Sequence, residues 1–123
     1  MKNLSSETCQ RLKEAGFPQP EKAIGQLWYA CSDLCLICPD SRYGTLAASI
    51  QKNVLIGINA PVDWAYCPTA LEIAEKINCN ISFMPSGIHQ IVHSNHFKIE
   101  QTFNLPESLA EIWCFENYKI NEQ

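Results

Sequence analysis

Three cysteines have the spacing in this chain that is most typical of a metal or iron–sulfur site: Cys31, Cys35 and Cys38. Thiolates spaced in this way can bind zinc or a cluster when the backbone lets them converge. The same segment has strand-forming side chains on both sides of Ser32 and Asp33, which is typical of a β-hairpin. A hairpin separates the thiols, whereas a metal site needs them in one loop, so the two interpretations exclude each other.

The hairpin interpretation is favoured because both flanking segments are rich in strand formers. In a strand, Cys35 and Cys38 point to opposite faces of the sheet. With a turn at Ser32-Asp33, Cys31 would share a face with Cys38 at a distance of about 13 Å. The spacing also resembles the cluster loop of radical S-adenosylmethionine enzymes, but 123 residues are too few for their barrel-like fold. We therefore expect no metal and no cofactor at these thiols.

Histidines recur in a second predicted hairpin, formed by residues 88–92 and 97–103. A two-residue turn at residues 94–95 would place His93 opposite His96, and His89 opposite Glu100. Two histidines could chelate a metal, yet no third ligand is obvious. We expect a solvated face that, if it binds anything, binds a partner protein. The predicted solvent-facing side of this hairpin carries His89, His93, His96, Lys98 and Glu100.

A loop at residues 39–44 is the other candidate for binding, because Arg42 and Tyr43 lie next to each other in it. We expect this pair to be exposed. Arginine and tyrosine are enriched at interface hot spots, and aromatic side chains also stack on nucleotide bases. The sequence does not separate these two uses.

Cys67 precedes Pro68 at the start of a predicted helix, where the helix N-terminus can activate a thiol. No local motif ties a histidine to Cys67, as a cysteine nucleophile requires. The chain also lacks a glycine-rich phosphate loop, a serine-nucleophile elbow and a zinc-protease motif. We expect a protein that is not an enzyme; a zinc-dependent or thiol-dependent enzyme is the less favoured alternative.

Three helices are predicted: residues 4–15, residues 70–77, and a last helix that starts with Pro106 as its first residue. The first is expected to begin at Ser5 or Ser6 and to end at Gly16. Thr69 and Glu72 form a capping box for the second, with Leu71 on its apolar face. Leu105 offers no side-chain cap to the last helix, which is expected to fray after Tyr118. A further short helix is expected over residues 45–52.

Strands are predicted in hairpins, so the sheet should be mainly antiparallel; they cover residues 26–38 (two strands), 54–58, 62–66, 81–84, 88–92 and 97–103. The chain has 123 residues, of which 46% are hydrophobic, which suits one domain with a core. We therefore expect a single α+β domain over residues 1–123, with about three helices packed on the sheet.

Composition excludes several classes of partner. The net charge of −4 argues against strong direct nucleic-acid binding, which needs clustered Lys and Arg. The N-terminal residues lack the apolar region of a signal peptide, and no apolar run is long enough to span a bilayer. We expect a cytoplasmic protein without a membrane partner. Its seven cysteines, an odd number, cannot all pair within one chain.

Three segments together resemble a family of small, largely uncharacterised proteins encoded by phages and prophages: residues 12–19 (LKEAGFPQ), 66–72 (YCPTALE) and 106–113 (PESLAEIW). This chain departs from the family pattern at Cys67, where a small residue is expected, and at Leu105, where a threonine cap is more usual. The first departure argues against a catalytic role for Cys67. The resemblance implies an accessory gene of a mobile element and implies no reaction.

Small phage accessory proteins often bind and disable a host protein. The resemblance therefore implies a host protein or ribonucleoprotein as the partner, and most specifically an inhibitor of a host defence system of the anti-CRISPR type. A small-ligand or nucleotide-binding protein that sequesters a signalling molecule is the alternative, and it predicts a pocket with convergent polar groups.

Overall fold

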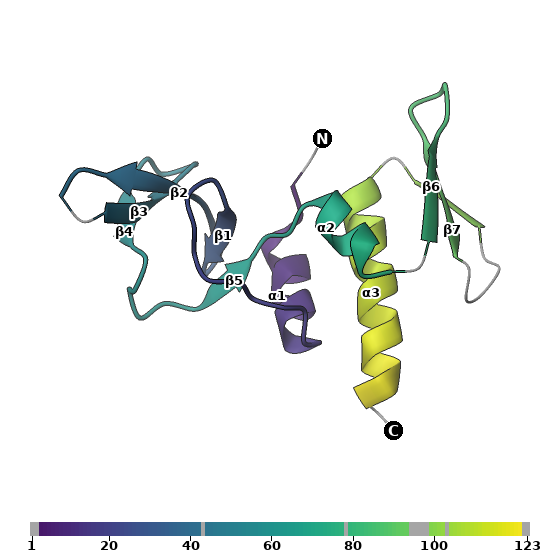
Figure 1. Cartoon of the computed structure of the whole chain (residues 1–123), viewed down its shortest axis with the longest axis horizontal. Coiled ribbons are helices and arrows are strands. Elements are labelled where there is room, and N and C mark those ends of the chain that lie inside the picture. The colour runs from purple at the N-terminus through teal and green to yellow at the C-terminus, as the bar shows by residue number, and fades with distance from the viewer. Residues whose placement is uncertain (1–2, 43, 78, 94–98, 103, 122–123) are drawn as a thin grey trace. The chain divides into compact units, whose positions relative to one another are not determined.

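The structure, a computed structural model, describes residues 3–42, 44–77, 79–93, 99–102 and 104–121. The chain forms two compact units, Ser5–Pro68 and a second unit that combines Met1–Leu4 with Thr69–Gln123. Each unit contains helix and an antiparallel sheet (Figure 1), which confirms the α+β class. The expectation of one domain over residues 1–123 stays a prediction.

The first unit has one helix and five strands: α1 (Ser6–Glu14), β1 (Leu27–Ala30), β2 (Asp33–Asp40), β3 (Gly44–Ser49), β4 (Leu55–Gly57) and β5 (Trp64–Tyr66). The strand order is β4-β3-β2-β1-β5, and every neighbouring pair is antiparallel. The sheet is therefore built from consecutive hairpins, with β5 added beside β1.

Helix α1 begins and ends as predicted. The Ser5 side chain accepts a hydrogen bond from the Thr8 N–H at 3.2 Å, which satisfies one of the donors left open at the first turn. At the other end, Gly16 adopts a φ of +96° and the Phe17 N–H donates to the Leu12 carbonyl at 2.8 Å. This is a Schellman motif, and the glycine is there because other residues avoid that φ.

The first hairpin turns at Cys31-Ser32 and not at Ser32-Asp33, because Ala30 pairs with Asp33 across β1 and β2. Cys31 adopts a φ of +59°, and its N–H donates to the Asp63 carbonyl at 2.9 Å. The predicted turn was wrong by one residue because β1 pairs with β2 on one side and with β5 on the other. The register between β1 and β5 places Cys31 directly after the end of β1.

Residues 44–49 form strand β3, so the short helix predicted over residues 45–52 was wrong. Ala47 and Ser49 are buried at alternate positions, which is the periodicity of a strand. Alanine and leucine in this segment favour a helix only weakly, whereas β3 forms ladders with β2 on one side and β4 on the other. Pairing on both sides outweighs that local preference.

The second unit contains two helices and three strands: α2 (Ala70–Glu75), β6 (Cys79–Phe83), β7 (His89–His93), β8 (Ile99–Thr102) and α3 (Leu105–Asn121). The sheet order is β6-β7-β8, again antiparallel. Helix α2 contacts α3, and the two helices lie side by side in Figure 1.

The capping box of α2 is confirmed. The Thr69 hydroxyl accepts from the Glu72 N–H at 3.2 Å, and the Glu72 carboxylate accepts from the Thr69 N–H at 3.2 Å. Ile73 is fully buried, but Leu71 is 69% exposed. The prediction that Leu71 belongs to the apolar face was wrong, because a six-residue helix buries only a narrow stripe.

Helix α3 starts at Leu105, one residue before the predicted Pro106, and it does have a side-chain cap. The Asn104 side chain accepts from the Glu107 N–H at 3.4 Å, so the expectation of an uncapped helix was wrong. The Thr102 hydroxyl accepts from the Asn104 N–H at 2.9 Å and fixes the entry to the helix. The helix continues to Asn121 and does not end at Tyr118.

The register of the β7–β8 pair differs from the prediction. His89 pairs with Thr102 and Ile91 pairs with Glu100, so His89 does not lie opposite Glu100. Val92 pairs with Ile99, and the turn predicted at residues 94–95 lies outside the described residues. Ile91 shares a face with His89 and is fully buried, so this part of the face is not exposed to solvent as predicted.

Candidate functional site

Of the residues predicted to bind a partner, Arg42 is exposed at the loop between β2 and β3. Its backbone N–H donates to the Asp40 carboxylate at 2.9 Å, which shapes the turn and leaves the guanidinium on the surface. Tyr43 lies outside the described residues.

His89 is half-buried in β7, where its ring meets the ring of Phe83 edge-on at 5.2 Å. Its Nδ1 atom is buried and has no hydrogen-bond partner within the described part of the chain. His93 belongs to β7, but its side chain, His96 and Lys98 lie outside what the structure describes. The structure therefore places one residue of the predicted histidine surface and leaves the others as predictions.

The three cysteines of the spaced motif have three different environments. Cys31 is exposed in the turn, Cys35 is buried, and Cys38 is half-buried on the opposite face of β2. Burial raises the pKa of the Cys35 thiol, which favours its protonated form. Within the described parts of the chain, no three His, Cys, Asp or Glu side chains are grouped closely enough to hold a metal ion.

Cys67 is buried at 4% exposure, and its backbone N–H donates to the Leu27 carbonyl at 3.0 Å. This hydrogen bond continues the ladder between β5 and β1. A thiol that is closed off from solvent in this way does not favour attack on an external substrate.

One face of the five-stranded sheet carries a row of apolar side chains with solvent exposure. Leu36, Ala48 and Leu55 are direct neighbours across β2, β3 and β4. Leu36 is 39% exposed and Leu55 is 62% exposed. We call this row the β2–β4 apolar face. Its sequence signal is the continuous apolar run from Leu34 to Cys38, which gives β2 apolar side chains on both faces.

A shallow, open hollow borders the end of this face. It is lined by Thr45, Leu46, Gly57, Ile58, Asn59 and Ala60. Arg42 lies in the loop that precedes β3, and Lys52, 66% exposed, lies in the turn that follows it. The Lys52 ammonium pairs with the Asp33 carboxylate at 3.3 Å. The two ends of β3 therefore carry basic side chains in a chain that is acidic overall.

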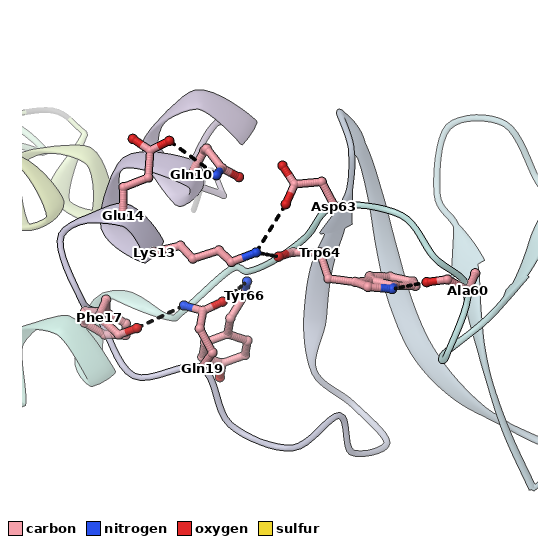
Figure 2. Close-up of polar contacts among 9 residues, drawn as sticks. All are labelled: Gln10, Lys13, Glu14, Phe17, Gln19, Ala60, Asp63, Trp64 and Tyr66. Atoms are coloured by element: carbon pink, nitrogen blue, oxygen red, sulfur yellow. Dashed lines mark hydrogen bonds and ion pairs between the residues drawn. The ribbon is translucent and has the colours of Figure 1, made fainter.

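Side chains cover the β5 edge of the sheet more completely than the β4 edge. Figure 2 shows the β5 edge. At β5, the Tyr66 N–H donates to the Gln19 side chain at 2.9 Å, and the Lys13 ammonium donates to the Trp64 carbonyl at 2.6 Å. Lys13 also pairs with Asp63 at 3.2 Å. Side chains thus occupy the outward backbone groups of β5, which is a common way to block strand addition.

At the opposite edge, β4 is covered in part, because the outward Gly57 carbonyl accepts from the Ala60 N–H at 3.0 Å. The Ser49 N–H donates to the Val54 carbonyl at 2.8 Å, so the backbone groups of Val54 and Ile56 face β3. Those of Leu55 then face outward. Val54 is 51% exposed and extends the apolar surface along this edge. The outward N–H and C=O of Leu55 therefore form the open part of this edge, where a further strand can pair.

A lysine and two tryptophans form a second cluster in the first unit, on the other face of the sheet. The Lys22 ammonium lies 4.8 Å from the ring centroid of Trp28 and 4.7 Å from that of Trp64. The sequence analysis missed this cluster, because its members are far apart in the chain and no short motif links them. Pairing between β1 and β5 brings the two tryptophans together.

Among the described residues, no helix is long and apolar enough to cross a membrane. Comparisons of the chain with protein-family models, with curated proteins and with solved structures found no match.

Proposed function

We propose that this chain is a non-catalytic accessory protein of a phage or prophage that acts in the cytoplasm by binding a host protein. The observation that carries the proposal is the β2–β4 apolar face beside the open edge of β4. Exposed apolar surface next to a strand edge with unpaired backbone groups is typical of a docking site. The resemblance of the three helix-boundary segments supports the phage origin, and the most specific form of the proposal is an inhibitor of a host defence protein or ribonucleoprotein.

The partner chemistry follows from the surface. An extended segment of the partner would pair with the outward N–H and C=O of Leu55, since main-chain hydrogen bonds supply affinity in strand addition. Its apolar side chains would cover Leu36 and Leu55. An acidic side chain at one end would meet Arg42, in the loop that precedes β3, whereas Lys52 at the other end already pairs with Asp33. The expected occupant is therefore an extended, apolar segment with an acidic residue at the end near Arg42.

Leu55 gives the sharpest test because it belongs to both the apolar face and the open edge. Leu55→Asp places a charge where the partner would bury the leucine, which should cost about 2 kcal/mol or more. That corresponds to about a 30-fold loss of affinity. Leu71→Asp is the matched control, since Leu71 is similarly exposed, at 69% against 62% for Leu55, but lies on α2.

The experiment starts with the wild-type protein as bait at near-stoichiometric amounts in host lysate, followed by titration of the purified partner that it recovers. Loss of binding in Leu55→Asp with retention in Leu71→Asp supports the proposal. A partner that binds both variants equally contradicts the assigned surface. Recovery of no protein partner at that bait level counts against the protein-binding function itself.

One observation favours a second candidate function, small-ligand or nucleotide binding: the hollow lined in part by Thr45 and Asn59, whose side chains could hydrogen-bond a ligand. A thermal shift with nucleotides that is lost in Asn59→Ala would support this function. If a panel of mono-, di- and cyclic nucleotides produces no thermal shift, this second function is contradicted.

A further inference from the structure

The cluster of Lys22, Trp28 and Trp64 has the geometry of an aromatic cation site. Two indole rings share one ammonium, at 4.8 and 4.7 Å from the ring centroids. These distances are within the range in which ring faces attract a cation. Ala30 pairs with Trp64, and Trp28 pairs with Tyr66, so both indoles project from adjacent strands to the same face of the sheet.

Both rings are held by contacts that do not involve the lysine. The Trp28 Nε1–H donates to the Gln26 side chain at 3.0 Å, and the Trp64 Nε1–H donates to the Ala60 carbonyl at 3.0 Å; Figure 2 shows the second bond. Trp28 also packs against the Tyr66 ring, with centroids 5.2 Å apart and planes tilted by 52°. The site is therefore organised before any cation enters it.

Lys22 does not match this site well. Its ammonium is strongly hydrated and has three hydrogen-bond donors, whereas the two ring faces offer it no lone-pair acceptor. Burial, and to a lesser extent the charge of Lys13, lower the pKa of the Lys22 amine, so the charged form is held at a cost. A methylated ammonium has fewer or no donors to leave unpaired. It suits two ring faces better than a primary amine does.

We propose that Trp28 and Trp64 form a binding site for a methylated ammonium group, with Lys22 as a resident occupant that the ligand displaces. Lys22 lies between α1 and β1 in a segment without helix or strand, so its side chain can withdraw without breaking a ladder. The group could belong to a free quaternary amine or to a methylated lysine of a protein. The site lies on the sheet face opposite Leu55, so its test does not depend on the outcome for the proposed function.

Lys22→Ala opens the site while leaving both indoles in place. Tetramethylammonium chloride is the probe, with sodium chloride at equal concentration as the reference, and the indole N–H signals of Trp28 and Trp64 are followed by NMR. We expect saturable shifts, with affinity for Lys22→Ala about tenfold above that of the wild type. Lys76→Ala, which removes an exposed lysine from the second unit, should behave like the wild type.

In the Lys22→Ala background, Trp64→Leu should abolish saturation. Trp64→Phe, which keeps a ring, should bind more weakly than the tryptophan and serves if the leucine variant does not fold. A trimethyl-lysine peptide is titrated in parallel: tighter binding than tetramethylammonium supports a protein ligand, and equal binding supports a free amine. Absence of saturable shifts for both probes up to about 100 mM, or saturation that persists equally in Trp64→Leu, overturns the proposal.

Discussion

Gln19→Met tests the protection of the β5 edge. The Gln19 side chain accepts from the Tyr66 N–H at 2.9 Å and donates to the Phe17 carbonyl at 3.1 Å (Figure 2). Methionine keeps the length of the side chain but removes both polar atoms. The substitution therefore takes from β5 the acceptor that serves its outward backbone N–H, with little change in volume.

The expected loss of folding stability in Gln19→Met follows from the burial of Tyr66. Tyr66 is 6% exposed, so water does not readily replace the lost acceptor. Taking the partner from a buried donor costs about 1–3 kcal/mol, which for a chain of this size lowers the Tm by about 3–10 °C. The edge of β5 also becomes available for pairing, so we expect more self-association on concentration.

Gln10→Met is the matched control, because the chemical change is the same. Gln10 contacts Glu14 at 3.4 Å on an exposed face of α1 (Figure 2). Such a pair contributes only about 0.2–0.5 kcal/mol. Thermal and urea unfolding, with light scattering for association, would compare the two variants. Equal losses of stability for Gln19→Met and Gln10→Met would refute the reasoning.

Three further predictions concern local stability and thiol chemistry. Gly16→Ala should cost about 1 kcal/mol in urea unfolding, through backbone strain alone, because a Cβ there meets no atom within 4 Å; no loss would contradict the Schellman geometry. Thr69→Ala should cost about 1 kcal/mol by breaking the capping box with Glu72, whereas Thr69→Ser should retain most of it. The raised pKa of the Cys35 thiol means that the folded state keeps the proton longer than the unfolded state, so this contribution is complete below about pH 8.5 and is lost as pH rises further. Urea unfolding from pH 7 to 10 should show that loss in the wild type and a smaller one in Cys35→Ala; identical slopes would remove Cys35 as its source.

The ends of two helices were predictable from the sequence because each depends on neighbouring residues. Ser5 and Gly16 bound α1, and Thr69 with Glu72 begins α2, as a few side-chain and backbone hydrogen bonds require. At α3 the same local reasoning failed by one position. It assigned the cap to Leu105 when the acceptor is the preceding Asn104.

The candidate sites were less predictable, because strands from distant parts of the sequence assemble them. The continuous apolar run around Leu36 indicated a strand apolar on both faces, but not that Leu55 would extend this row across β4. The Trp28–Trp64 site had no local signal. The histidine hairpin had one, but its register is shifted by two residues, and the buried Ile91 lies on the same face of β7 as His89, which the prediction assigned to solvent.

Local patterns in the chain were enough to predict the α+β class, the antiparallel hairpins, the position of the first two helices and the opposite orientation of Cys35 and Cys38. These follow from periodicity and from hydrogen bonds within a few residues. Local patterns did not predict that residues 44–49 are a strand, that the first hairpin turns at Cys31, or how each edge of the sheet is covered. Pairing between strands sets these features, and its free energy comes from partners that no local window of the sequence contains.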